Sequence, residues 1–291
     1  MVKMKEFYLI ILIPFTLMVV FDYIPMYGVL IAFKDFKINK GIIGSDWNNF
    51  EHFRKFFNDL YFWRYVGNTF RIAFLRITIC FVAPIIFALL LNEVKQMRFK
   101  KIVQTISYLP HFMSWVVIAG FVYQLLSPQY GLIIVKLGGE AKFFMGDPKM
   151  FVTVLISSFL WQGIGWGSVV YLASIAGIDS TMYESAEIDG ANRFHCVWHI
   201  TLPSIMPMIT ILFILSLRGI LSAGFDPIFN LSNDLVLETA DVIETYSFRQ
   251  GLYNAKYGYS AAIGLFQNLV GLSFLFGSNF IIKKINNQGI F

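Results

Sequence analysis

The chain has 291 residues, of which 57% are hydrophobic, 18% aromatic and only 14% charged, and its mean hydropathy is +0.63. Such a composition excludes a soluble globular domain. The net charge of +5 comes from Lys and Arg residues that cluster at the edges of apolar runs. Lipid headgroups and membrane topology explain this excess better than nucleic acid, which is not expected as a partner.

Six apolar runs are each long enough to cross the hydrocarbon core as a helix. Because lipid cannot satisfy bare backbone N–H and C=O groups, each run is predicted to be helical. In chain order the runs cover residues 7–33, 68–91, 102–126, 150–172, 205–225 and 260–282. The sequence therefore predicts an all-α membrane protein with six transmembrane helices. Residues 1–291 form one domain in this prediction, and both termini lie on the same side of the membrane.

The first run, residues 7–33, follows Lys3 and Lys5, as the apolar part of a signal peptide would. The run is too long for a signal peptide, and no cleavage site with small residues follows it. We therefore expect an uncleaved first span.

No catalytic or metal-binding constellation is visible. Cys80 falls in the second run and Cys196 in a polar loop, so a disulfide between them is not expected. His195 and His199 could share a helix face, but their place in the same loop favours a structural or interfacial role. The chain contains no Gly-Lys dipeptide, which a Walker A loop requires. We predict that the chain is not an enzyme, holds no metal or cofactor, and draws its energy from another polypeptide.

The polar loop between the fourth and fifth runs, residues 173–204, is the strongest functional signal. Asp179 and Ser180 can begin a short helix that carries acidic residues in its first turns. Gly190 then permits a turn that a side chain would obstruct. Pro203 can start the next helix, where its missing N–H is harmless. The loop is thus predicted to be a short helix–turn–helix knob at the membrane surface; a surface helix without a partner is the alternative.

This loop resembles the signature of the permease subunits of bacterial ATP-binding-cassette importers, which reads E-A-A, three residues, Gly, nine residues and I-x-L-P. The matching residues are Glu184, Ala186, Gly190, Ile200, Leu202 and Pro203, and Ser185 replaces the first alanine. In that family the loop docks on an ATPase subunit in the cytoplasm. The resemblance therefore implies a type I importer permease core with a cytoplasmic coupling-helix loop and an N-in/C-in orientation. The implied coupling residues are Glu184, Ser185, Ala186, Asp189, Gly190 and Pro203.

Further blocks resemble the carbohydrate-uptake branch, and within it the lipoprotein-assisted oligosaccharide/polysaccharide permeases. They cover residues 31–36, 89–94, 109–112, 161–167 and 257–264, together with Asn68-Thr69. The resemblance implies a multi-pass subunit of the bacterial cytoplasmic (inner) membrane that imports an oligosaccharide by alternating access. Its implied partners are a second homologous permease, two ATPase subunits that bind ATP and Mg²⁺, and an extracytoplasmic sugar-binding (lipo)protein.

Polar and aromatic residues inside the runs are candidates for the substrate pathway. Arg218 lies near the middle of the fifth run, where a charge facing lipid is costly, so we expect it to face a wet cavity or a partner subunit. An ion pair within the fold is the alternative for Arg218. Arg71 and Arg76 in the second run can instead snorkel to the headgroups. The other candidates are Trp115, Trp161, Trp166, Gln267 and Asn268, for which interfacial anchoring and helix packing are alternative roles.

Two other functions remain open. An importer permease for a peptide or an amino acid would have the same coupling loop and a different cargo. A self-contained secondary transporter would need acidic residues within the membrane for ion coupling, and Asp22 is the nearest candidate.

Overall fold

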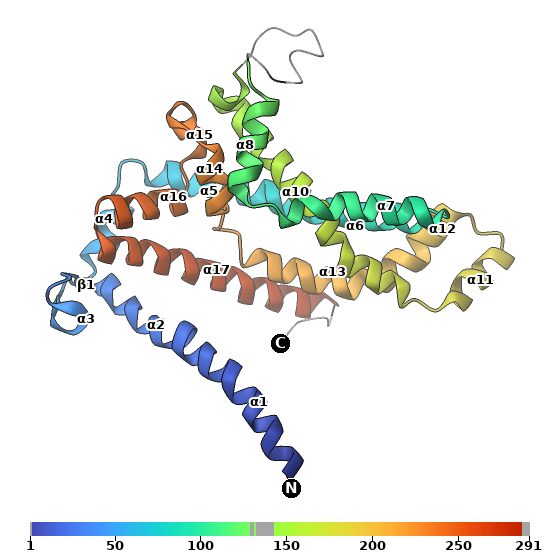
Figure 1. Ribbon diagram of the computed structural model, residues 1–291, viewed down its shortest axis with the longest axis horizontal. Helices are drawn as coiled ribbons and strands as arrows, with labels where there is room; N and C mark the ends of the chain where they lie inside the picture. The colour runs from blue at the N-terminus through green and yellow to red at the C-terminus, as the bar shows by residue number, and fades with distance from the viewer. Residues whose placement is uncertain (1, 129–130, 132–142, 287–291) are drawn as a thin grey trace. The chain divides into compact units, whose positions relative to one another are not determined.

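The computed structural model describes residues 2–128, 131 and 143–286, which are mostly helical (Figure 1). The chain forms two compact units. The first unit contains Met1–Phe62 and Tyr246–Asn268, and the second contains Trp63–Thr245 and Leu269–Phe291. Within the described residues, five helices are long and apolar enough to cross a membrane, or six if one bent pair of helices is a single span.

The first unit combines a long N-terminal helical segment with a small polar region. Strands β1 (Lys34–Asp35) and β2 (Asp46–Trp47) pair antiparallel in this region. The helical elements are α1 (Val2–Met18), η1 (Val19–Tyr23), α2 (Ile24–Met26), η2 (Tyr27–Phe33), α3 (Gly41–Gly44), α4 (Glu51–Phe57), η8 (Arg249–Tyr253) and the beginning of α17 (Tyr257–Asn286).

The second unit holds most of the chain and is built around α10, which packs against α6 and α7 (Figure 1). Its elements before the polar loop are α5 (Phe62–Leu75), η3 (Arg76–Cys80), α6 (Phe81–Asn92), α7 (Met97–Tyr108), η4 (Leu109–Phe112), α8 (Trp115–Leu125), η5 (Phe144–Gly146) and α10 (Pro148–Ala176). Those from the loop onward are α11 (Ser180–Ile188), α12 (Arg193–Cys196), η6 (Val197–Thr201), α13 (Leu202–Leu217), α14 (Phe225–Leu231), η7 (Asp234–Val236), α15 (Leu237–Ala240), the beginning of α16 (Ile243–Phe248), which continues into the first unit at Tyr246, and the end of α17.

Prolines account for irregular turns inside three of the long helices. A proline cannot donate the backbone hydrogen bond of a regular turn, and its ring meets the carbonyl four residues earlier. A locally widened π turn relieves that conflict. The π turns η1, η3 and η6 come just before Pro25, Pro84 and Pro203, respectively.

The third predicted span is not a continuous helix. Met97–Phe112 and Trp115–Leu125 meet at an angle of 107°. Pro110 lies in the short turn η4, and Met113 and Ser114 that follow have extended backbones. Ser114 then caps α8 by accepting a hydrogen bond from the Val117 N–H at 3.4 Å. The expectation of one uninterrupted helix over residues 102–126 is therefore wrong. The run is apolar throughout, so its hydropathy does not reveal that the helix breaks after Pro110.

Other spans confirm the helical prediction with shifted ends. The first, Phe7–Phe33, has the predicted bounds, whereas the fourth extends over Pro148–Ala176. The fifth occupies Arg193–Leu217, so it begins and ends earlier than the predicted residues 205–225. Apolar composition locates these spans but does not mark where the helix continues into polar residues.

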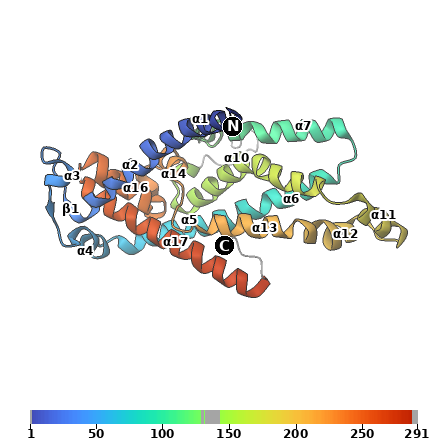
Figure 2. The same ribbon diagram turned by 90° about the horizontal axis from the view of Figure 1, so that it is seen from below.

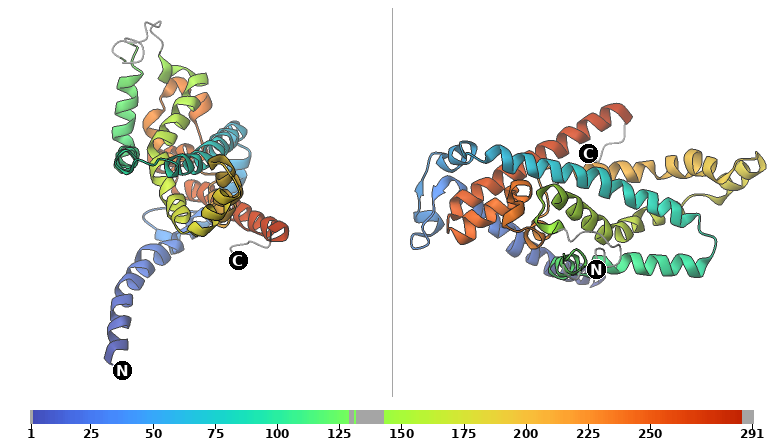
Figure 3. Two further views of the ribbon diagram at one scale, coloured as in Figure 1. Left: turned by 90° about the vertical axis from the view of Figure 1, so that its right-hand side faces the viewer. Right: turned by 90° about the horizontal axis from the view of Figure 1, so that it is seen from above.

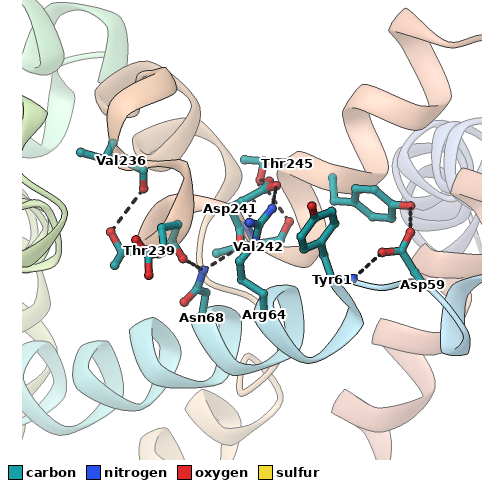
Figure 4. Close-up of polar contacts among 11 residues, drawn as sticks. Asp59, Tyr61, Arg64, Asn68, Val236, Thr239, Asp241, Val242 and Thr245 are labelled. Carbon is teal, nitrogen blue, oxygen red and sulfur yellow. Dashed lines mark hydrogen bonds and ion pairs between the residues drawn. The ribbon is translucent and has the colours of Figure 1, made fainter.

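A polar cluster in the second unit ties α5 to the segment between α15 and α16 (Figure 4). Asp241 is only 2% exposed, and its carboxylate accepts a hydrogen bond from Thr245 at 3.0 Å and lies 3.7 Å from the Arg64 guanidinium. The Asn68 amide donates to the carbonyls of Glu238 and Asp241 at 2.9 and 3.1 Å. Buried polar groups are costly unless they are paired, so these bonds fix the start of α5 against the segment that follows α14.

Small residues let α10 approach its neighbours. A Cβ added at Gly165 would collide with the backbone carbonyl of Ser107 in α7, and one at Gly167 would lie 3.0 Å from the ring of Pro84 in α6. At Gly163, by contrast, an added Cβ would meet nothing within 4 Å. The close-packing role expected for small residues in membrane helices thus applies to Gly165 and Gly167 but not to Gly163.

We predict that Gly165→Ala destabilises the protein by about 1–3 kcal/mol, because the added methyl group forces α7 and α10 apart. Gly163→Ala is the matched control and should be neutral or stabilising by roughly 0.5–1 kcal/mol, since alanine favours the helix and the site is open. Thermal unfolding of the detergent-purified variants measures both effects. Equal melting temperatures for the two variants would contradict the packing described here.

Candidate functional site

The loop after α10 contains the short helix that the sequence predicts. α11 begins after Asp179, whose side chain accepts a hydrogen bond from the Thr181 N–H at 3.0 Å. The hydrogen bonds from the backbone and side chain of Thr181 lower the pKa of the Asp179 carboxyl, because they stabilise its charged form. In Figures 2 and 3, α11 (yellow) lies beyond the ends of the neighbouring helices of the second unit. The N-capped helix is therefore confirmed.

One side-chain hydrogen bond joins α11 to the helix that follows it. The Tyr183 hydroxyl and Thr201 Oγ1 lie 2.9 Å apart. Thr201 is only 1% exposed and belongs to η6, which continues without interruption into α13. This contact gives α11 a direct connection to a long helix of the second unit, in addition to the covalent chain.

Gly190 adopts the turn expected of it, although for a different reason. Its φ is +79°, a conformation that L residues rarely adopt, yet an added Cβ would meet nothing within 4 Å. The constraint is therefore the backbone conformation and not the lack of space.

Pro203 does not start the second helix of the loop. That helix begins at Arg193, where Asn192 caps it by accepting a hydrogen bond from the His195 N–H at 2.9 Å, and it runs through η6 to Leu217. Pro203 consequently lies inside a continuous helix. The preceding π turn accommodates it, so the prediction that it opens the helix is wrong.

The outer surface of α11 combines acidic and apolar side chains. Glu184, Ser185 and Asp189 are exposed, and Ala186 is half-buried. The Ser185 hydroxyl donates to the Thr181 carbonyl of its own helix at 2.9 Å. Ile188, one turn after Glu184 and hence on the same face, is 87% exposed, and Phe194 across the turn is 66% exposed. Large apolar side chains beside charged ones at a loop tip are typical of a surface that contacts another protein.

An ion pair connects the α11 loop to the end of α6. Arg193 at the start of α12 lies 3.7 Å from the Glu93 carboxylate and also donates to the Glu93 carbonyl at 3.4 Å. Glu93 is the C-cap of α6. Such an exposed pair adds only about 0–1 kcal/mol of stability, but it shows that the end of α6 and the loop with α11 lie together.

The candidate pathway residues belong to both units. Trp115 packs edge-on against Phe159 beside the core of the second unit, and Trp166 stacks on His111 at 4.7 Å. Trp161 stacks on Phe121 at 6.0 Å and lines a largely apolar pocket of about 440 Å³ in the same unit. Gln267 and Asn268 belong to the first unit, where Asn268 donates to the Gly264 carbonyl at 3.0 Å. A substrate role for these residues stays a prediction.

Arg218 and Arg76 both lie in surroundings other than those predicted. Arg218 is the C-cap of α13 and is exposed, so it lies at the end of the span and not at its middle. Its carbonyl oxygen would lie 2.7 Å from a Cβ added at Gly271 of α17. Arg76, expected at the headgroups, instead lies over the Phe159 ring at 5.5 Å, and its guanidinium reaches the backbone at Gly219 and Gly224. The end of α13 decides the position of Arg218, whereas Arg76 lies in the π turn within the span Phe62–Asn92 and faces Phe159.

A carboxylate that the sequence did not single out holds the turn between α13 and α14. Glu244 accepts hydrogen bonds from the Ser222 hydroxyl at 2.7 Å and from the N–H groups of Ala223 and Gly224 at 3.0 and 3.1 Å. The turn thereby satisfies backbone donors that no helix pairs. No local sequence signal marks Glu244, because its partners lie 20 to 22 residues earlier in the chain.

Residues 80–287 match the family described as binding-protein-dependent transport system inner membrane component. The chain is 38% identical to protein LplB of Bacillus subtilis (strain 168), over 99% of this chain and 91% of that relative. It is 39% identical to the polygalacturonan/rhamnogalacturonan transport system permease protein YteP of the same organism, over 100% and 92% of the two chains. The chain belongs to this family. It is thus an inner membrane transport component and not a member of an enzyme family.

Solved structures extend this likeness to the fold. This inner membrane component is 37% identical to a chain of a bacterial ABC transporter involved in the import of the acidic polysaccharide alginate, with a TM-score of 0.89 over 98% of this chain and 97% of that chain. A second structure, the alginate transporter in complex with an alginate pentasaccharide-bound periplasmic protein, gives a TM-score of 0.90, 36% identity and coverage of 99% and 97%. The inner membrane component therefore has the type I importer permease fold.

We predict that Tyr183→Phe loosens α11 without unfolding it. Losing one hydrogen bond of about 1 kcal/mol should speed amide exchange across residues 180–190 roughly fivefold. Ser185→Ala is the control, since its hydroxyl bonds only within the helix and alanine is a better helix former. Hydrogen–deuterium exchange of the purified variants gives the comparison, and unchanged exchange in Tyr183→Phe would contradict the proposed connection to α13.

Proposed function

We propose that this chain is the transmembrane permease subunit of an ATP-driven importer that translocates an oligosaccharide delivered by an extracytoplasmic binding protein. The likeness to the alginate importer chain, over nearly the whole of both chains, carries the proposal. Other relatives are also transport permeases for sugars: YteP for polygalacturonan or rhamnogalacturonan, and AraP of Bacillus subtilis for arabinooligosaccharides. These cargoes favour an oligosaccharide over a peptide or an amino acid.

We assign α11 the role of the coupling helix that docks on an ATPase subunit. Its exposed Glu184 and Ile188 offer a charge and an apolar anchor on one face. Gly190, Asp189, Ser185 and Ala186 shape the helix and its turn. Because Tyr183 bonds to Thr201 at the base of α13, a displacement of α11 moves that long helix as a rigid element. A movement of the ATPase subunits would thus be transmitted through α11 and α13 to the translocation path.

The docking role implies that the loop of residues 173–204 is cytoplasmic. The contact between Arg193 and Glu93 supports a common side for this loop and the connection after α6. If the bent pair α7–α8 counts as one span, the chain has six spans with both termini in the cytoplasm. The remaining partners in this proposal are a second homologous permease and two ATPase subunits, which would hold ATP and Mg²⁺.

Affinity purification of the full chain from its native membrane in mild detergent tests the assembly. We expect an ATPase, a second permease and an extracytoplasmic binding protein to elute with it. A chain that elutes alone and still transports after reconstitution would instead be a self-contained transporter, with Asp22 as its nearest candidate for ion coupling.

Glu184→Lys should abolish uptake while the subunit remains in the membrane, because a positive charge replaces the acid at the docking face and like-charge contacts at interfaces are strongly unfavourable. Glu238→Lys, at an exposed acid in α15, is the control and should transport normally. Uptake of radiolabelled oligosaccharide by cells, with immunoblots of membrane fractions, measures both. Normal uptake by Glu184→Lys would refute the docking role.

A further inference from the structure

The first unit contains a polar pocket that the coupling proposal does not use. Its volume is about 620 Å³, within the range of small-molecule sites. The walls come from two segments of this unit, residues 35–59 and residues 246–259. In contrast to the apolar pocket beside Trp161, this one is lined mainly by polar atoms and tyrosine and phenylalanine rings.

A hydrogen-bonded framework fixes one wall. The Tyr246 hydroxyl donates to the Asp59 carboxylate at 2.7 Å and lies 3.1 Å from the Tyr259 hydroxyl. Because the single O–H of Tyr246 points to Asp59, the Tyr259 hydroxyl donates to the Tyr246 oxygen. Burial and the neighbouring Asp59 carboxylate raise the pKa of Tyr246, which keeps it protonated. Gly258 lets its segment approach the opposite segment of the wall closely. A Cβ added at Gly258 would lie only 2.6 Å from His52 Nε2 and 2.8 Å from the Lys34 carbonyl.

The acidic groups of the pocket are already engaged. Asp59 accepts from Tyr246 and also from the Tyr61 N–H at 2.8 Å. Asp35 lies 3.9 Å from the His52 imidazole. Both carboxylates therefore already have partners within the pocket wall.

Most hydrogen-bond donors of the pocket, in contrast, can still bind a ligand. Lys37 and Lys256 line the pocket, and in the described part of the chain neither ammonium forms an ion pair or hydrogen bond. Lys55 is paired with Glu51 at 2.6 Å. The side-chain carbonyl of Gln250 accepts a hydrogen bond from the Asn254 side-chain amide at 3.2 Å. The side-chain NH₂ group of Gln250 therefore remains as a donor. Two free cations and an amide donor are complementary to a carboxylate.

Aromatic rings supply the second half of a saccharide site. Phe36 and Tyr257 lie edge to face at 6.1 Å in the pocket wall, next to Tyr246 and Tyr259. Flat apolar rings cover the C–H faces of a pyranose, while ammonium and amide groups bind its charged and hydroxyl oxygens. A neutral peptide or a lipid tail would leave these polar donors unpaired.

We infer that this pocket binds a uronate unit of an acidic oligosaccharide before the saccharide enters the membrane. The inference rests on the proposed function, since one span separates residues 246–259 from the α11 loop along the chain and so places the pocket on the extracytoplasmic side. Lys37 and Lys256 hold the carboxylate, and the aromatic wall takes the sugar ring. The pocket thus receives a saccharide end released by the binding protein and selects for negative charge.

The test measures binding to the full chain, purified with its co-eluting partners in nanodiscs and without the binding protein. Digalacturonate is the probe, and neutral digalactose is the matched saccharide. We expect saturable binding of digalacturonate that weakens at high salt, and at least tenfold weaker binding of digalactose. The Lys37→Gln and Lys256→Gln variants should each lose roughly tenfold in affinity, because each removes one charged hydrogen bond.

Lys40→Gln is the control, since Lys40 is on the same loop but pairs with Asp46 at 3.0 Å and does not line the pocket. Equal affinities for the charged and neutral disaccharides, or no binding while the complex retains ATP hydrolysis stimulated by its binding protein, would overturn the inference and leave the importer function standing. Loss of binding-protein affinity in the lysine variants without any saccharide binding would also overturn it, in favour of an acidic protein segment as the occupant. A chain that elutes without an ATPase defeats the proposed function itself.

Discussion

Backbone hydrogen bonding inside hydrocarbon is the constraint on which the rest of this structure depends. Every long apolar segment must pair its own N–H and C=O groups, and helices do so within the segment. Irregular backbone is tolerated only where other groups take over that pairing. The turn after α13 meets this condition through Glu244, which accepts hydrogen bonds from Ser222, Ala223 and Gly224. The break before α8 meets it in part through Ser114.

The two units carry different functional features. In the second unit α11 presents Glu184 and Ile188 outward, and the bond between Tyr183 and Thr201 connects it to α13. In the first unit, residues 35–59 and 246–259 form a polar pocket with two lysines that form no ion pair among the described residues. We propose that α11 receives mechanical work from partner subunits and that the pocket receives the saccharide. The helices of the second unit need only be stiff and closely packed, as Gly165 and Gly167 allow.

Residue patterns with local causes were predicted well. The Asp179 cap, the short helix after it and the turn at Gly190 depend on neighbours within a few residues, and the structure confirms them. Predictions that depended on where a helix ends were less accurate. Arg218 lies at the end of its span and Pro203 lies inside a helix, because caps and π turns shift ends that hydropathy alone cannot locate. Arg76 lies over Phe159 inside the fold, a tertiary contact that the apolar pattern does not encode.

The sequence by itself determined that this chain is a helical membrane protein and, through its coupling loop, which family it resembles. The protein class follows from composition and the family resemblance from short-range spacing, and neither requires knowledge of tertiary contacts. Only the tertiary structure decided which polar groups meet: Tyr183 with Thr201, Glu244 with the turn at Gly224, and Asp59 with Tyr246. Asp59 and Tyr246 lie 187 residues apart in the chain, and no local pattern encodes a contact over that separation. Such contacts arise only when packed helices bring distant segments to the same place.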